Sequence, residues 1–234
     1  MLNVCISGAN RGLGLEFCRQ LLANSNELMV VAGVRNPEKA TELNQLMRNS
    51  EGRLNVLKLD VSDTDSVGAF ALKLKESLSG NRLDLLINNA GLFEDDGGVG
   101  QNFNPDALMK SFNVNAIGPL RLISALSDQI AETGGKVVNI SSLMGSLADN
   151  ASGGYYAYRA SKAALNMCVR SFAIDRPELI TVAMHPGWVQ TDMGGQQAPL
   201  TVQESVASLL RVIFQLKPTD TGTFKNYDGS TLPW

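Results

Sequence analysis

Short apolar runs alternate with longer helical patterns from one end of the chain to the other. Six of these runs are rich in Val, Ile or Leu and show little polar alternation: residues 2–7, 28–34, 54–59, 83–88, 136–141 and 179–185. Strands that are covered on both faces of a parallel sheet have this continuous apolar character. We therefore expect these six runs to be buried strands.

Helical patterns lie between the apolar runs and begin near Gly12, Pro37, Ser62, Pro105, Tyr155 and Thr201. Pro37 and Pro105 suit a first helical turn, where the missing N–H of proline has no partner to lose. Ser62, with Asp65 three residues later, has the spacing of a capping box. Pro177 is expected to end the helix that precedes it.

This alternation predicts an α/β fold, a doubly wound parallel sheet with right-handed crossovers. No internal repeat, charge block or linker rich in Pro and Gly divides the 234 residues. We expect one domain that spans residues 1–234.

Composition narrows the classes of partner and compartment. Hydrophobic residues make up 44% and charged residues 18%, with a net charge of −3, so the chain has no basic footprint for nucleic acid or an acidic membrane. Cys5, Cys18 and Cys168 are widely separated and are expected to be reduced core residues, and with the single His185 they predict no metal site. No apolar run has the length of a membrane span, and no signal peptide fits before Ser7, so a cytoplasmic protein is expected.

A glycine-rich turn follows the first expected strand. The segment "SGANRGLGLEFCRQLL" places Gly8, Gly12 and Gly14 between a strand and an amphipathic helix. Glycines at such a turn let backbone N–H groups at the start of the helix approach a pyrophosphate. Tight packing of the helix against the strand, without a ligand, is the alternative interpretation.

Two arginines favour NADP(H) over NAD. The second strand ends "VAGVRNPEK", with Arg35 at its end and no carboxylate before Glu38 to bind a ribose 2′-hydroxyl, and Arg11 lies in the glycine turn. Two converging guanidinium groups suit a 2′-phosphate. The alternative is that both arginines are solvated surface residues.

Seven motifs occur in an order typical of one enzyme family. They are "SGANRGLG" (7–14), "DV" (60–61), "NNAG" (88–91), "NVNAIG" (113–118), "NISS" (139–142), "YRASK" (158–162) and "HPGWVQT" (185–191). Taken together, the chain resembles the compact, single-domain short-chain dehydrogenase/reductases. The segments "MHPGWVQTDMGG" and "KNYDGSTLPW" are most similar to the sniffer-type, C-factor-like carbonyl reductases.

The resemblance implies a Rossmann-type sheet of about seven parallel strands in the order 3-2-1-4-5-6-7, with a weak seventh strand around residues 223–226. It also implies that Asp60 accepts a hydrogen bond from the adenine amino group, although Asp60 alone would be interpreted as a helix-start residue. Asn89 is implied to hold strands together. The residues implied to contact NADP(H) are Gly8, Asn10, Arg11, Gly12, Leu13, Gly14, Arg35, Asp60, Val61, Asn89, Ala90, Gly91, Tyr158, Lys162, Pro186, Gly187, Val189 and Thr191.

One of the tyrosines in "SGGYYAYRASKAAL" is the candidate proton donor. Tyr158 and Lys162 are four residues apart and therefore neighbours on a helix, as the family's Y-x-x-x-K requires. A nearby cation is expected to lower the pKa of the tyrosine. Tyr155 has the same spacing to Arg159, but a lysine ammonium is better suited to bridge a phenol and ribose hydroxyls. Tyr155 and Tyr156 are expected to be substrate-pocket or interface residues.

The resemblance supplies the other members of the site. Ser142, the second serine of its pair, matches the catalytic serine, and Asn115 matches the residue that supports a water linking the lysine to solvent. Asn115 could equally accommodate a helix kink. His185 is expected to be structural, and the segment "DMGGQQAP" at 192–199 is expected to be a mobile substrate lid.

These residues imply an NADP(H)-dependent oxidoreductase that reduces the carbonyl of a small molecule, an aldehyde, ketone or quinone, through Ser142, Tyr158, Lys162 and Asn115. A C-factor-type signalling protein that binds NADP(H) with little turnover is the alternative, and an epimerase or dehydratase is a third possibility. A homodimer or homotetramer is implied, with helices at 105–132 and 155–175 forming the interface.

Overall fold

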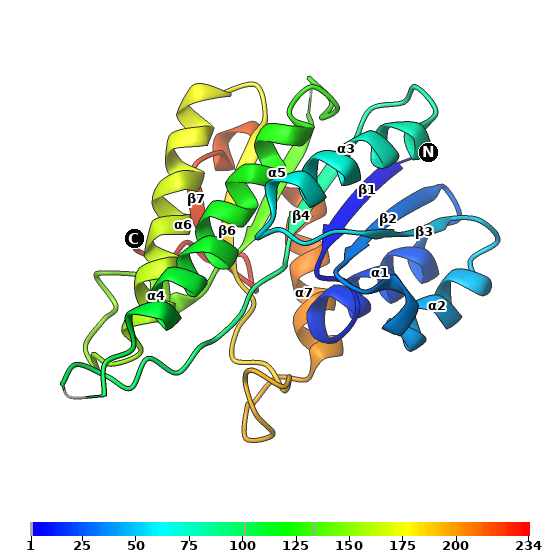
Figure 1. The fold of residues 1–234 in the computed structure, drawn as a ribbon. Coiled ribbons are helices and arrows are strands. Elements are labelled where there is room, and N and C mark those ends of the chain that lie inside the picture. Colours follow the sequence, from blue (N-terminus) through cyan, green and yellow to red (C-terminus); the bar gives the residue numbers. More distant parts are fainter. Residues whose placement is uncertain (1, 101, 133) are drawn as a thin grey trace.

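The computed structural model describes residues 2–100, 102–132 and 134–234. Its centre is a parallel sheet of seven strands in the order β3-β2-β1-β4-β5-β6-β7 (Figure 1). The strands are β1 (Leu2–Ser7), β2 (Leu28–Val34), β3 (Leu54–Lys58), β4 (Leu85–Asn88), β5 (Lys136–Ile140), β6 (Ile180–His185) and β7 (Thr223–Asn226). The expected fold class, strand order and weak seventh strand are confirmed.

Helices cover both faces of the sheet (Figure 1). The α-helices are α1 (Gly12–Asn24), α2 (Thr41–Arg48), α3 (Thr64–Leu78), α4 (Pro105–Phe112), α5 (Gly118–Leu126), α6 (Tyr156–Asp175) and α7 (Val202–Gln215). The short helices are η1 (Pro37–Lys39), the π-helical η2 (Asn113–Ile117), η3 (Leu143–Gly145) and η4 (Pro218–Asp220).

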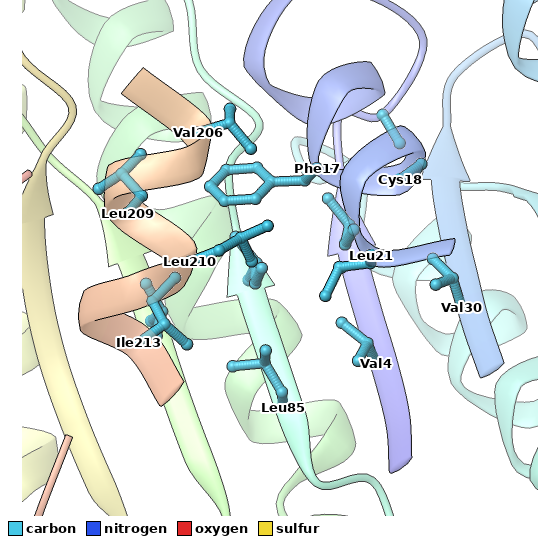
Figure 2. Packing of buried hydrophobic residues seen from close by; sticks show 14 of the residues in the cluster. Val4, Phe17, Cys18, Leu21, Val30, Leu85, Val206, Leu209, Leu210 and Ile213 are labelled. Atoms are coloured by element: carbon cyan, nitrogen blue, oxygen red, sulfur yellow. The ribbon is translucent and has the colours of Figure 1, made fainter. Parts of the chain in front are cut away.

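Alternate residues of the central strands β1, β2, β4 and β5 contribute to two separate cores, because successive strand side chains point to opposite faces. On one face, Phe17 and Leu21 of α1 pack with residues of α7 such as Val206 over Val4 and Leu85 (Figure 2). On the other face, α3 and α5 cover the intervening strand residues, among them Cys5, Val31 and Leu86. This double coverage explains the continuous apolar runs in the sequence.

Three expectations about helices and cysteines are corrected by the structure. The N-cap of α3 is Asp63, whose carboxylate accepts hydrogen bonds from the N–H groups of Asp65 (2.9 Å) and Ser66 (3.3 Å), and the capping box expected at Ser62 is wrong. The helix expected over 105–132 is divided by η2 and ends at Leu126. Cys168 is half-buried rather than part of the core.

The carboxyl ends of all parallel strands meet at one edge of the sheet. The glycine turn follows β1, Arg35 follows β2, Asp60 lies just beyond β3, and the "NNAG" segment continues from β4. Ser142 follows β5 by one residue, and the "PG" turn follows β6. The candidate residues are therefore gathered at the edge where open α/β sheets bind ligands.

The described part of the chain has no helix that combines the length and the apolar character needed to span a bilayer.

Candidate active site

Tyr158 and Lys162 lie together in the first two turns of α6. Tyr158 is 8% exposed and Lys162 is 4% exposed. The Nζ atom of Lys162 lies 5.7 Å from the centre of the Tyr158 ring and donates a hydrogen bond to the Ile140 carbonyl at 2.9 Å. The helical spacing of four residues thus places the ammonium beside the phenol, between α6 and the end of β5.

Ser142 completes this cluster from the end of β5. Its hydroxyl faces the Tyr158 hydroxyl closely enough to act against a rise in the pKa of the phenol, and its Oγ accepts from the Met144 N–H at 3.2 Å. Gly145 brings this turn close to α6, since a Cβ there would lie 2.8 Å from the carbonyl carbon of Lys162. The structure therefore brings Ser142, Tyr158 and Lys162 together.

Burial controls the titration of this cluster. It raises the pKa of Tyr158 to about 12, against the opposing effect of the Ser142 hydrogen bond. It also lowers the pKa of Lys162 to about 8, because a charged form is poorly solvated inside the protein. The expected lowering of the tyrosine pKa by Lys162 is not found in this arrangement, since desolvation is the larger effect.

Asn115 lies in the π-helical turn η2. The helix is therefore distorted at this residue, as the interpretation of Asn115 as a residue at a helix kink requires. Its side chain donates to the Leu92 carbonyl (2.9 Å) and to the Ser161 Oγ (3.0 Å), and accepts from the Leu92 N–H (2.8 Å). A Cβ on Gly91 would lie 3.4 Å from Asn115 Oδ1 and 3.6 Å from Lys162 Nζ. Asn115 and Lys162 therefore flank the same glycine.

Ser161 was not recognised in the sequence as part of this network. It is fully buried, and its Oγ donates to the Tyr158 carbonyl at 2.8 Å while accepting from Asn115. It therefore connects η2 to α6. Its position three residues after Tyr158, on the same helical face, is the signal that could have identified it.

The glycine turn is built for close approach of the backbone. Gly8 has a φ of +68°, and a Cβ there would lie 2.8 Å from the Ala90 Cα. A Cβ on Gly14 would lie 2.3 Å from the Gly8 carbonyl oxygen. Asn89 fixes the turn by donating from Nδ2 to the Ser7 and Gly8 carbonyls, both at 3.0 Å. This packing fixes the turn at the N-terminus of α1, where the N–H groups of a helix can bind a pyrophosphate.

A cavity of about 600 Å³ lies beside this turn, at the ends of β2 and β3. Its lining residues are Arg35, Asn36, Lys58, Asp60, Asp63, Ser66, Ala69 and Lys73. The cavity combines cationic and hydrogen-bonding groups, which suits the adenosine phosphate end of a dinucleotide.

Asp60 is held at the rim of this cavity by Ser62, whose N–H (2.9 Å) and hydroxyl (2.6 Å) both donate to Oδ1. Burial acts to raise the pKa of Asp60, but the Ser62 hydrogen bonds and the charges of Arg35 and Arg121 outweigh it and lower the pKa. The carboxylate is therefore ionised and fixed as an acceptor.

Arg11 and Arg35 do not converge in this structure. Arg35 lines the cavity, whereas the exposed Arg11 forms an ion pair with Asp192. Asp192 belongs to the segment after β6, and Thr191 lies against the glycine turn, since its Cγ2 is 3.6 Å from where a Gly12 Cβ would lie. The two segments thus meet across the N-terminus of α1.

The segment expected to be a mobile lid is folded on itself by hydrogen bonds. Trp188 donates from Nε1 to the Gly194 carbonyl at 2.7 Å, and Gln190 donates from Nε2 to the Ala198 carbonyl at 2.9 Å. Val189 forms an isolated parallel bridge with Leu200. These contacts give the segment a defined shape beside Pro186 and Gly187.

His185 lies at the end of β6, and its Nδ1 is buried without a hydrogen-bond partner among the described residues. Burial lowers its pKa to about 4, although the charge of Asp149 acts in the opposite direction. His185 is therefore neutral at pH 7. Among the described residues, no group of three or more His, Cys, Asp or Glu side chains is arranged to hold a metal ion.

Comparisons with known proteins agree with this geometry. A family model described as short chain dehydrogenase matches residues 2–200. The C-signal of Myxococcus xanthus is 48% identical over 155 residues, which cover 65% of this chain and 93% of that protein.

Two solved structures extend the similarity to the whole chain. The carbonyl reductase Sniffer of D. melanogaster is 32% identical, with a TM-score of 0.92 and 100% of both chains covered. The NADPH-bound carbonyl reductase from chicken fatty liver is 36% identical, with a TM-score of 0.92, and the match covers 99% of this chain and 94% of that chain. The expected similarity to sniffer-type and C-factor-like proteins is confirmed.

Proposed function

This chain belongs to the short-chain dehydrogenase family, and on that premise we propose that it is an NADP(H)-dependent oxidoreductase that reduces the carbonyl of a small molecule to an alcohol. The observation that supports the proposal most directly is the buried contact of Tyr158 with Ser142 on one side and Lys162 on the other. An aldehyde, a ketone or a quinone is the substrate class.

The edge of the sheet offers a place for each part of NADP(H). The glycine turn would hold the pyrophosphate at the N-terminus of α1. Arg35 would bind the 2′-phosphate, and Asp60 would accept from the adenine amino group. Arg11 would join Arg35 by exchanging Asp192 for the phosphate, because a guanidinium binds either anion through the same donors. Two carbonyl reductases of similar structure, from chicken fatty liver and from Pseudomonas aeruginosa, bind NADPH and NADP respectively.

When bound, NADPH supplies the hydride that attacks the carbonyl carbon. Ser142 donates a hydrogen bond to the carbonyl oxygen, where negative charge develops. Tyr158 gives that oxygen a proton as general acid, and its high pKa keeps the phenol protonated until then. Lys162 has three donors, so it can bind the ribose hydroxyls as well as a backbone carbonyl and stabilise the phenolate that remains. Asn115 holds the water that returns a proton toward Lys162.

The test is oxidation of NADPH and, separately, of NADH, with a panel of aldehydes, ketones and quinones. Wild type is expected to oxidise NADPH with at least one of them and to prefer it to NADH. Tyr158→Phe should lower turnover by about 10²- to 10⁴-fold, the usual contribution of a positioned proton donor, while its Kd for NADPH changes little. Ser171→Ala, which removes an exposed hydroxyl from the same helix, is the control. Turnover by Tyr158→Phe within tenfold of wild type would end this assignment.

The similarity to C-signal supports a second candidate, a signalling protein that binds NADP(H) with little turnover. The same assay separates the two. A signalling protein would bind NADPH in a titration but oxidise none of it with any carbonyl compound.

A further inference from the structure

The helix that carries Tyr158 does not cap its own N-terminus. The residue at the N-cap of α6 is Tyr155, which adopts a left-handed conformation (φ +52°) and makes no side-chain capping hydrogen bond. A non-glycine residue in this region is strained. The N–H groups in the first turn of α6 have no partner within the helix. One of them, that of Ala157, immediately precedes Tyr158, and it needs a hydrogen-bond acceptor from elsewhere in the chain.

Asp96 is that partner, although it lies 61 residues earlier, in the segment that follows β4. It is 4% exposed, and its Oδ2 accepts a hydrogen bond from the Ala157 N–H at 2.7 Å. Its Oδ1 accepts from the Gly98 N–H at 2.9 Å, and its own carbonyl accepts from the Asn104 N–H at 3.0 Å. A buried carboxylate is stable in this place because it faces N–H donors at the positive end of a helix.

The same segment contacts the active site at two further points. Leu92 is hydrogen-bonded through both its N–H and its carbonyl to Asn115. The Phe93 ring lies 5.1 Å from the Tyr158 ring and 5.5 Å from the Tyr155 ring, centre to centre. Residues 92–96 thus contact η2, the catalytic phenol and the start of α6.

We propose that Asp96 is a positioning residue for the reaction: it fixes the first turn of α6 so that the Tyr158 hydroxyl stays beside Ser142. Asp96 does not contact the phenol itself and acts through the helix backbone. This inference rests on the proposed function, because it assigns a role within the same catalytic site.

The test compares Asp96→Ala and Asp96→Asn with wild type. Asp96→Ala should lower kcat by about 10- to 100-fold, since a small misplacement of a catalytic group has effects of that size. Its Kd for NADPH should stay within about twofold of wild type, because most of the expected cofactor residues lie on elements other than α6. Asp96→Asn keeps an oxygen that can accept from the Ala157 N–H, so it should retain much of the wild-type kcat. If Asp96 acted only through its negative charge, Asp96→Asn would lose as much kcat as Asp96→Ala.

Two control variants separate positioning from a general loss of stability. Asp95→Asn changes an exposed carboxylate of the same segment, which accepts from the Gly97 N–H at 3.0 Å. Thr201→Ala removes the capping box of α7, a helix without any proposed catalytic group. Both controls should keep kcat near that of wild type. The proposal is overturned if Asp96→Ala also keeps it, or if its loss equals that of Thr201→Ala.

A second measurement tests the capping contact separately from the proposed function. Amide hydrogen exchange at residues 156–161 should become faster in Asp96→Ala and remain unchanged in both controls. This readout requires no turnover, so it tests the capping contact even if wild type reduces no carbonyl. Unchanged exchange in Asp96→Ala would overturn the proposal, whereas absence of turnover in wild type would overturn only the proposed function.

Discussion

At the scale of single residues, burial sets the charge states of Tyr158 and Lys162. It lowers the pKa of Lys162 to about 8 and raises that of Tyr158 to about 12. Both shifts favour the neutral side chain, so the phenol keeps its proton at neutral pH. A tyrosine that retains its proton in this way can still donate it to an oxygen on which charge develops.

His185 should make the protein sensitive to acid. Its pKa is lowered from 6.5 to about 4 in the folded protein, so between these values the unfolded chain binds more protons. The contribution to stability is complete above pH 6.5 and is lost as the pH falls toward 4, by about 2–3 kcal/mol. The free energy of unfolding in urea should therefore fall less between pH 7 and pH 4.5 for His185→Gln than for wild type. An equal loss in both proteins would contradict this origin of the acid sensitivity.

At the scale of helices and strands, the helix ends differ in whether local or distant residues bind their free N–H and C=O groups. Asn104 caps α4 with its own side chain, and Thr201 caps α7 through a capping box. In contrast, α6 depends on Asp96, and the last turn of α7 is satisfied by Lys136, whose Nζ donates to the Ile213 carbonyl at 2.8 Å. The N-termini of α4 and α7 therefore depend on local residues, whereas the N-terminus of α6 and the C-terminus of α7 depend on residues from distant segments.

The C-terminus of α3 can be improved by a glycine. Its C-cap, Ser79, has a left-handed backbone (φ 51°, ψ 40°), which glycine adopts without the cost imposed by a Cβ. Ser79→Gly should raise the free energy of unfolding by about 0.5–1 kcal/mol in a urea titration. The matched control is Ser127→Gly at the C-cap of α5, where the backbone is right-handed (φ −54°, ψ −39°). This variant should lower the free energy of unfolding by about 0.5–1 kcal/mol. Equal effects at both positions would refute the explanation.

Elements and sites were predictable where the determinants are local. The strands followed from apolar runs, and the pairing of Tyr158 with Lys162 followed from helical spacing. The expected N-cap of α3, Ser62, lies one residue before the observed one. The Ser62 hydroxyl donates to Asp60, and Asp63 caps the helix instead. The contact of Asp96 with Ala157 and the pKa of Tyr158 depend on tertiary packing between distant segments, which no local pattern encodes.

At the scale of the whole molecule, the sheet divides the proposed functions between its two halves. Strands β3, β2 and β1 carry the cavity and the glycine turn, while the segments after β4 and β5, together with α6, carry the catalytic cluster. Asn89 joins the halves by bonding the end of β4 to the turn after β1. A dinucleotide bound as proposed would therefore lie across both halves.

The outer surface of α6 should form the interface of a homodimer. Met167 is 67% exposed and Ile174 is 66% exposed, seven residues apart on one face of the helix, and apolar residues exposed on one face favour association. Light scattering should give a dimer for wild type and a monomer for the double variant Met167→Glu, Ile174→Glu. Leu72→Glu on α3, which replaces a side chain of equal exposure (67%), is the control and should remain a dimer. A monomeric wild type would refute the expected assembly.

Strand β1 is synthesised before the other six strands, yet it lies inside the sheet and pairs with β2 on one edge and with β4, residues 85–88, on the other. Until β4 has been synthesised, the second edge carries unpaired N–H and C=O groups, which can capture a strand of another nascent chain. Slow codons before residue 85 should therefore prolong the stage at which the nascent chain is prone to aggregate. A pause after β4 has emerged should instead give β4 time to pair with β1.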